Sequence, residues 1–368
     1  MSPPAKKPVE DDEPFLAPRE NPALFGQAEA ETAVLEAWSS GRMPHAWLIS
    51  GPKGVGKATL AHRMARFVLA SGGEGDGLFG PPESLALDPN HPVFRRAASG
   101  GHADLRTVEI GINPRTGKLR TEIVADDVRE LAGFFHMTAA EGGWRVAVID
   151  AADDMNRTAA NAVLKILEEP PPDALLLLVS HGPARLLPTI RSRCRKLVLR
   201  ALAEEDVVRI LRDGMPEIGE EEARLLARLS EGSPGRAIEL ARREGPALYR
   251  QLLAVLEGLP VLDIGAIGAL GDKAAGRGAD NESFETVAEL LRGVLSRLVR
   301  AKATGEISAP DPAEAALLTR LIARGGLEPW ADAIDAAEDL LRSADPQNLD
   351  RRQVLQTALL GLEAPARA

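Results

Sequence analysis

The chain has 368 residues, of which 27% are charged and 45% hydrophobic, an ordinary balance for a globular protein of two or three domains. Its formal net charge of −10 argues against non-specific nucleic-acid binding by the whole surface. The single cysteine, Cys194, excludes an intramolecular disulfide framework and a cysteine-cluster metal site. No apolar run approaches the roughly 18 residues of a membrane span, and the N-terminus lacks a signal-peptide core, so we expect a cytoplasmic protein without zinc or another bound metal.

Residues 1–20 mix proline with charged residues and are predicted to be a disordered tail. The first strong motif begins at Gly51 and fits the phosphate-binding pattern G-x-x-x-x-G-K, with Ala58 where serine or threonine is expected. A buried strand leads into it and a helical pattern follows, so backbone N–H groups and a helix N-terminus face a polyphosphate. The predicted nucleotide-binding residues here are Gly51, Gly54, Gly56, Lys57 and Thr59.

The missing hydroxyl at position 58 is the group that normally ligates Mg²⁺. Thr59 is not expected to replace it, because one step along a helix turns the side chain by about 100°. The segment therefore predicts a loop that can bind ATP or ADP weakly and is poorly equipped to hydrolyse it.

A second motif is the apolar strand 145–149, which ends at Asp150 in the manner of a Walker B aspartate that holds Mg²⁺. The residue that follows is Ala151, where the hydrolytic version has a glutamate that polarises water. Losing such a base costs about 10²–10⁴ in rate. Asp153 and Asp154 are expected to cap the next helix, over 155–169, rather than to replace the base.

The remaining strand of this region, 175–179, ends at Ser180, a position from which a polar side chain can contact a γ-phosphate. Strands that alternate with helices around a P-loop predict an α/β domain over 21–200, with a parallel sheet, flanking helices and the ligand at the carboxyl ends of the strands. The excursion over 71–101 is rich in Gly and Pro, and its histidines make no metal site.

From residue 201 the pattern is wholly helical. Helices over 204–213 and 220–229 precede a third helix, for which Ser233 and Pro234 suit the N-cap and first position. We interpret 201–245 as a small lid that carries Arg236 toward the nucleotide. Wide apolar stripes over 246–368 predict a domain of packed helices.

Together, four signatures resemble those of the AAA+ clamp-loader subunits of bacterial DNA polymerase III, and the resemblance spans residues 21–243. The signatures are His45–Leu48 entering the P-loop, Val148–Asp153 with Met155 and Asn156, Leu164–Pro171, and the triplet Ser192-Arg193-Cys194. The last two of these signatures are highly specific to this family.

The resemblance implies roles for matching positions. Arg193 would be an arginine finger that stabilises charge on ATP in the adjacent subunit. Ser180 and Arg236 match the first and second sensors, and Lys57 and Asp150 match the two Walker positions. Some relatives carry a four-cysteine zinc module after the P-loop, and Cys194 alone cannot form it.

The resemblance also implies partners. The chain would join a hetero-pentamer with delta and tau/gamma subunits that loads the sliding clamp on primed DNA, and the helices over 246–368 would form its oligomerising collar. The leading hypothesis is a subunit with little or no ATPase of its own. The alternatives are an ATP-hydrolysing motor subunit of tau/gamma type or a related AAA+ helicase, which predict Ser or Thr at position 58 and Glu at position 151, and a P-loop kinase, which leaves the Ser-Arg-Cys triplet unexplained.

Overall fold

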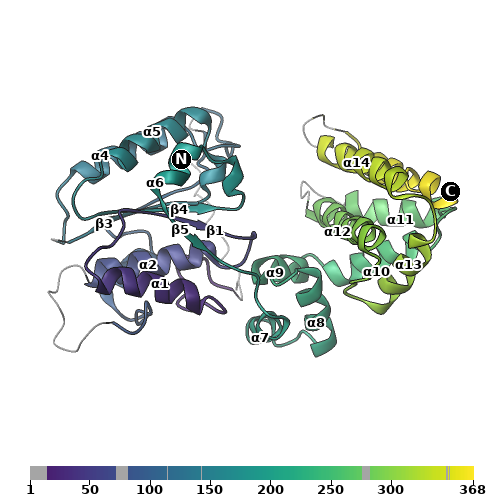
Figure 1. The fold of residues 1–368 in the computed structure, drawn as a ribbon, viewed down its shortest axis with the longest axis horizontal. Helices are drawn as coiled ribbons and strands as arrows, with labels where there is room; N and C mark the ends of the chain where they lie inside the picture. The colour runs from purple at the N-terminus through teal and green to yellow at the C-terminus, as the bar shows by residue number, and fades with distance from the viewer. Residues whose placement is uncertain are drawn as a thin grey trace, which may run out of the picture. The chain divides into compact units, whose positions relative to one another are not determined.

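The structure, a computed structural model, describes residues 15–71, 82–113, 115–141, 143–275, 282–344, 347 and 349–368. Most of the predicted N-terminal tail and part of the 71–101 excursion thus lie outside the described residues. The chain divides into two compact units, with the boundary between Asp206 and Val207 (Figure 1). No helix within the described ranges has the length and apolar character needed to cross a membrane.

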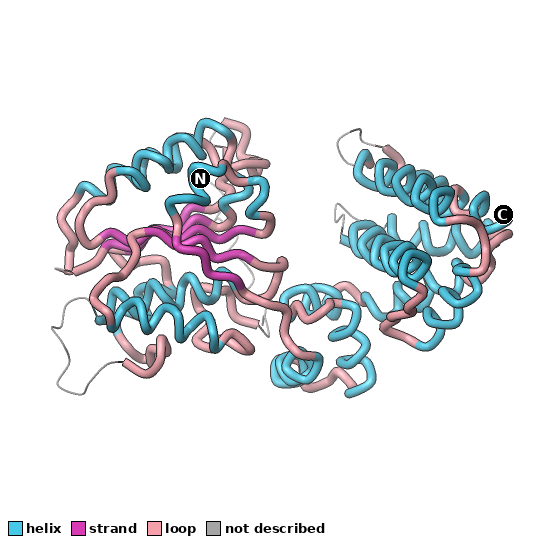
Figure 2. The backbone as a smooth tube through the Cα atoms, viewed as in Figure 1, coloured by secondary structure: helices cyan, strands magenta, loops and turns pink. Residues whose placement is uncertain are grey.

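The first unit alternates helices with strands, as Figure 2 shows. Its helices and strands are α1 (Ala28–Ser39), β1 (Ala46–Ser50), α2 (Lys57–Ser71), α3 (Pro92–Ala98), β2 (Leu105–Val108), α4 (Ala125–His136), β3 (Arg145–Ile149), η1 (Ala152–Asp154), α5 (Arg157–Glu168), β4 (Ala174–Ser180), η2 (Pro183–Arg185), α6 (Pro188–Arg193) and β5 (Arg195–Val198).

The five strands form one parallel sheet in the order β2-β3-β4-β1-β5. The central strands β3, β4 and β1 are buried along their whole length, as expected for parallel strands that helices cover on both faces. This arrangement confirms the predicted α/β fold with a parallel sheet and flanking helices. The strand order also places the carboxyl ends of β1, β3 and β4 side by side.

Alternating strand side chains enter two separate cores. Leu48 and Ile149 pack with α4, α5 and α6 on one face, whereas Trp47 and Val148 pack with α1 and α2 on the other. Figure 1 shows these two helical layers on opposite sides of the sheet. The sheet is thus held from both faces, which fixes the positions of its strand ends.

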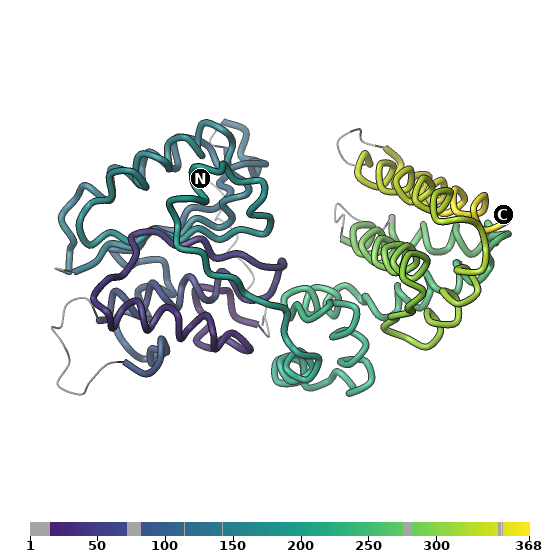
Figure 3. Tube along the Cα trace, in the orientation of Figure 1, coloured from purple at the N-terminus to yellow at the C-terminus, as the bar shows by residue number. Residues whose placement is uncertain are grey.

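The second unit is entirely helical where it is described, and Figure 3 follows its helices from green to yellow. They are α7 (Glu204–Gly214), which begins just before the division, α8 (Glu220–Leu229), α9 (Pro234–Arg242), α10 (Gly245–Leu256), α11 (Ile264–Ala275), α12 (Glu282–Thr304), α13 (Pro312–Ile322), α14 (Leu327–Ser343), α15 (Arg351–Leu360) and α16 (Glu363–Arg367).

The predicted helices over 204–213 and 220–229 are confirmed as α7 and α8. The predicted start of the next helix is also confirmed, because Ser233 is the N-cap of α9 and its Oγ accepts a hydrogen bond from the backbone N–H of Arg236 at 3.2 Å. The separation of a lid over 201–245 from a collar over 246–368 stays a prediction.

An ion pair lies in the core of the second unit. Glu314 of α13 is fully buried and accepts from Arg297 of α12, with Nε···Oε1 at 2.5 Å and Nη2···Oε2 at 3.0 Å. The Tyr249 hydroxyl of α10 donates to Glu314 Oε2 at 2.5 Å. Three helices therefore share one buried carboxylate, whose charge is compensated by Arg297 and the hydroxyl.

Candidate nucleotide-binding site

The loop from Gly51 to Gly56 connects β1 to α2 and depends on glycine at three positions. Gly51, Gly54 and Gly56 have φ angles of 147°, 79° and 95°, a region that side chains disfavour. At Gly51 a Cβ atom would also lie 2.4 Å from the carbonyl oxygen of Leu199. The backbone thus turns sharply between strand and helix and presents N–H groups at the N-terminus of α2, the geometry suited to an anion.

Lys57 is the first residue of α2, and its side chain folds over the loop. Only 3% of the residue is exposed, and Nζ donates to the carbonyl oxygens of Gly51 at 2.9 Å and Pro52 at 2.5 Å. Burial lowers the pKa of the Lys57 ammonium to about 8, against the opposing charges of Asp150 and Asp153. The ammonium is therefore held by the loop that would surround a phosphate.

Asp150 follows β3, and its backbone N–H donates to the Val108 carbonyl of β2 at 2.9 Å. Burial raises the pKa of its carboxyl to about 6, and the charge of Glu109 raises it further while Lys57 lowers it. The next residue, Ala151, is 4% exposed, so a methyl group stands buried where a hydrolytic site needs a carboxylate.

The expectation that Asp153 and Asp154 cap the next helix is wrong. The N-cap of α5 is Asn156, whose Oδ1 accepts from the Ala159 N–H at 2.9 Å. Asp153 lies in η1 and accepts instead from the end of β4. Its donors are the Ser180 hydroxyl at 2.9 Å, the Gly182 N–H at 3.2 Å and the His181 N–H.

Ser180 is the last residue of β4 and is fully buried. In the register of the sheet it lies beside Ser50, the residue before the P-loop, so it occupies the edge where a nucleotide would lie. Its hydroxyl hydrogen is directed to Asp153. The predicted first sensor is therefore hydrogen-bonded to the segment that follows Asp150, the predicted Walker B aspartate.

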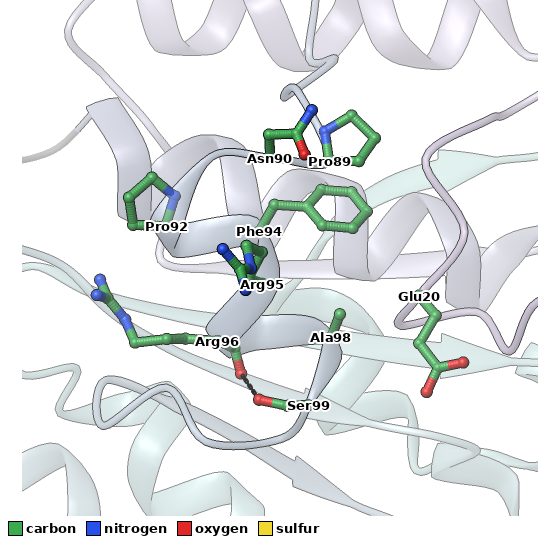
Figure 4. A pocket seen from close by; sticks show the side chains of 9 residues that line it. All are labelled: Glu20, Pro89, Asn90, Pro92, Phe94, Arg95, Arg96, Ala98 and Ser99. Carbon is green, nitrogen blue, oxygen red and sulfur yellow. Dashed lines mark hydrogen bonds between the residues drawn. The ribbon is translucent and has the colours of Figure 1, made fainter.

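The sheet thus brings together the predicted P-loop residues, Asp150 and Ser180 at one edge, because β1, β3 and β4 are neighbours. Thr59 lies within α2, half-buried, two residues beyond Lys57. Within the described residues, no three His, Cys, Asp or Glu side chains gather as candidate metal ligands. A surface hollow around α3, shown in Figure 4, is lined by other residues, among them Phe94, Arg95 and Arg96.

Sequence reasoning missed a second support of the P-loop, Gln27. This buried side chain donates from Nε2 to the carbonyl of Arg200 at 2.8 Å and to that of Val55 at 3.5 Å. It joins the P-loop to the segment that follows β5. The local sequence offers no signal for it, because its partners lie 28 and 173 residues away.

Arg193, the predicted finger, is the last residue of α6 and belongs to the first unit. Its side chain is 38% exposed and contacts Glu168 of α5, with Nη2···Oε1 at 2.9 Å. The next residue, Cys194, is buried, and burial raises the pKa of its thiol to about 12. Within the triplet, the buried Cys194 thus stands next to Arg193, whose side chain reaches the surface.

Arg236, the predicted second sensor, belongs to the second unit. It lies in the first turn of α9, and its guanidinium Nε is 2.5 Å from Glu289 Oε1 of α12. Within that unit, therefore, Arg236 forms an ion pair with a helix of the predicted collar. Its role as a sensor stays a prediction.

Comparisons with known proteins find similarity to subunits of DNA polymerase III. Residues 26–203 match the family described as DNA polymerase III, delta subunit. DNA polymerase III subunit delta' of Pseudomonas aeruginosa is 38% identical over 222 residues, 59% of this chain and 61% of that protein. Delta' of Bacillus subtilis is 34% identical over 209 residues, 55% of each chain.

Subunit tau of Escherichia coli is 30% identical over 322 residues, which are 82% of this chain and 47% of tau. The matches thus span about half to three fifths of the length of these relatives. Together with the sheet, the P-loop and the Ser-Arg-Cys triplet, these matches make the chain similar to DNA polymerase III subunits of the delta' and tau types.

Proposed function

We propose that the chain is a clamp-loader subunit of delta-prime type, which takes part in ATP-driven loading of the sliding clamp on primed DNA. It supplies Arg193 to the ATP site of an adjacent subunit and has little or no ATPase of its own. One observation carries the proposal. The exposed Arg193 belongs to a module whose own site has alanine at both position 58 and position 151.

The two alanines act on different parts of the reaction. Ala58 removes a metal-ligating hydroxyl, and the buried Ala151 removes the base that activates water. A subunit that hydrolyses ATP depends on both groups, whereas a subunit that donates an arginine to its neighbour depends on neither. The absence of both groups therefore supports action in trans.

ATP or ADP is proposed as a weakly bound, static ligand of this chain. The glycine conformations at Gly51, Gly54 and Gly56 and the buried Lys57 support retained phosphate binding. The nucleotide would then stabilise the module rather than drive it.

The proposed partners are delta and tau/gamma subunits in a hetero-pentamer, the sliding clamp, and primed DNA. The second unit would supply the oligomerising collar. Contact with DNA would be confined to a small basic patch of Arg191, Arg195 and Lys196, since the chain as a whole is acidic. A triple alanine variant of this patch should reduce the salt dependence of DNA binding by the assembly, and an unchanged slope would rule the patch out.

The test of the main proposal is steady-state ATPase of the reconstituted assembly. We expect the lone chain to be inactive and Arg193→Ala to remove most of the turnover at the neighbouring site, where a finger contributes on the order of 10³-fold or more. Arg193→Lys is the matched variant, since it keeps the charge and loses the planar donor pair. Turnover by the lone chain, with no effect of Arg193→Ala in the assembly, would contradict the proposal.

The second candidate is a motor subunit of tau/gamma type. It is favoured by the alignment to Escherichia coli tau, which extends over 82% of this chain. This candidate requires that the chain turn over ATP despite Ala58 and Ala151. The double variant Ala58→Ser, Ala151→Glu gives the positive control for such activity.

A further inference from the structure

The predicted finger is docked on its own chain. Arg193 Nη2 lies 2.9 Å from Glu168 Oε1, and Nη1 donates to the Thr189 carbonyl at 3.1 Å. The second contact uses a carbonyl of the first turn of α6, and the first uses the last residue of α5, a helix packed against α6. Both terminal nitrogens of the guanidinium, the pair that grips a phosphate bidentately, are therefore engaged within the chain.

The opposite charges of Arg193 and Glu168 favour this position of the guanidinium, but only weakly. Glu168 stands at the C-terminal end of α5, where the helix dipole also attracts a cation. The two side chains are 38% and 50% exposed, and ion pairs this exposed shift an equilibrium by at most about fivefold. The γ-phosphate of ATP carries more negative charge and offers bidentate geometry, so it competes well for the same nitrogens.

We propose that Glu168 is a positioning residue. Its ion pair holds Arg193 on its own subunit, in a parked position, until a nucleotide in the adjacent site binds the guanidinium. This proposal rests on the proposed function of Arg193 and adds a residue to it. The ion pair between Glu168 and Arg193 stabilises the assembly before ATP binds, so it lowers kcat/KM for ATP. It gives the finger a defined starting position and limits turnover at low ATP.

The test measures the ATPase activity of the reconstituted assembly and compares the native full chain with its Glu168→Gln variant, which keeps the shape of the side chain and loses the charge. We expect kcat/KM to rise about two- to fivefold, the range open to an exposed pair. Glu168→Asp should stay closer to the native value. Glu169→Gln is the matched control on the adjacent exposed residue and should change nothing.

The double variant separates this inference from its basis. In an Arg193→Ala background, Glu168→Gln should have no effect, because the parked group is gone. If Arg193→Ala lowers the rate while Glu168→Gln leaves kcat/KM unchanged or lowers it, the parking role is wrong and the finger stands. If Arg193→Ala itself has no effect, both proposals are wrong. Thermal melting of each variant chain verifies that folding is retained.

Discussion

The buried Lys57 should make the proposed nucleotide binding depend on pH. The residue is only 3% exposed and burial lowers its pKa to about 8, so a change from pH 7 to pH 9 removes most of the charge that a phosphate would meet. If binding requires the charged form, the apparent Kd scales with one plus the ratio of neutral to charged lysine. That factor is about 1.1 at pH 7 and about 11 at pH 9, which predicts a roughly tenfold weaker affinity at pH 9.

The assay is calorimetric titration of the full chain with ATP across this range. Lys57→Arg is the matched control, because a guanidinium keeps its charge throughout and should give a flat profile. A wild-type Kd that stays constant between pH 7 and pH 9 would refute the role given to the Lys57 charge. Absence of ATP binding at pH 7 would refute the static-ligand proposal itself.

Three further predictions concern folding and reactivity. Glu314→Gln should lower the free energy of unfolding by about 3–5 kcal/mol in urea denaturation, because it leaves Arg297 without its buried partner, whereas Glu338→Gln at an exposed pair should change it by less than about 0.5 kcal/mol. The contribution of Asp150 to the free energy of unfolding should fall as pH rises from 3.8 to about 6, because the folded carboxyl binds its proton more tightly than the unfolded one, so Asp150→Asn should shift the slope of stability against pH upward over this range. Cys194 should alkylate much more slowly in the folded chain than in urea, since its buried thiol has a pKa of about 12.

The sequence predicted the parts of the site that depend on local pattern. A strand, a glycine turn and a helix around Lys57 form one continuous segment, so the P-loop could be identified without long-range information. The apolar runs ending at Asp150 and Ser180 likewise predicted buried parallel strands. Their meeting at one edge followed from the general rule that parallel strands share a carboxyl end.

Other features escaped because their partners lie far away in the chain. Asp153 precedes a helix and resembles a cap, yet it binds donors 27 to 29 residues downstream. Glu314 resembles any polar helical residue until α10, α12 and α13 pack around it. The α3 helix has only seven residues, too few for a clear period, and His91 proved to be its N-cap with Nδ1 accepting from the Val93 N–H at 3.2 Å.

Asp153 helps to hold the shape of the predicted nucleotide site. Its carboxylate accepts hydrogen bonds from the Ser180 hydroxyl at the end of β4 and from the N–H of Gly182 just after it. Ser180 lies beside Ser50, where β1 leads into the P-loop. These contacts need neither a metal-ligating hydroxyl nor a base at position 151, so selection for hydrolysis is not required to preserve them. A module can thus lack both groups and keep these hydrogen bonds at its strand ends, as would suit a subunit proposed to act through Arg193 at the end of α6.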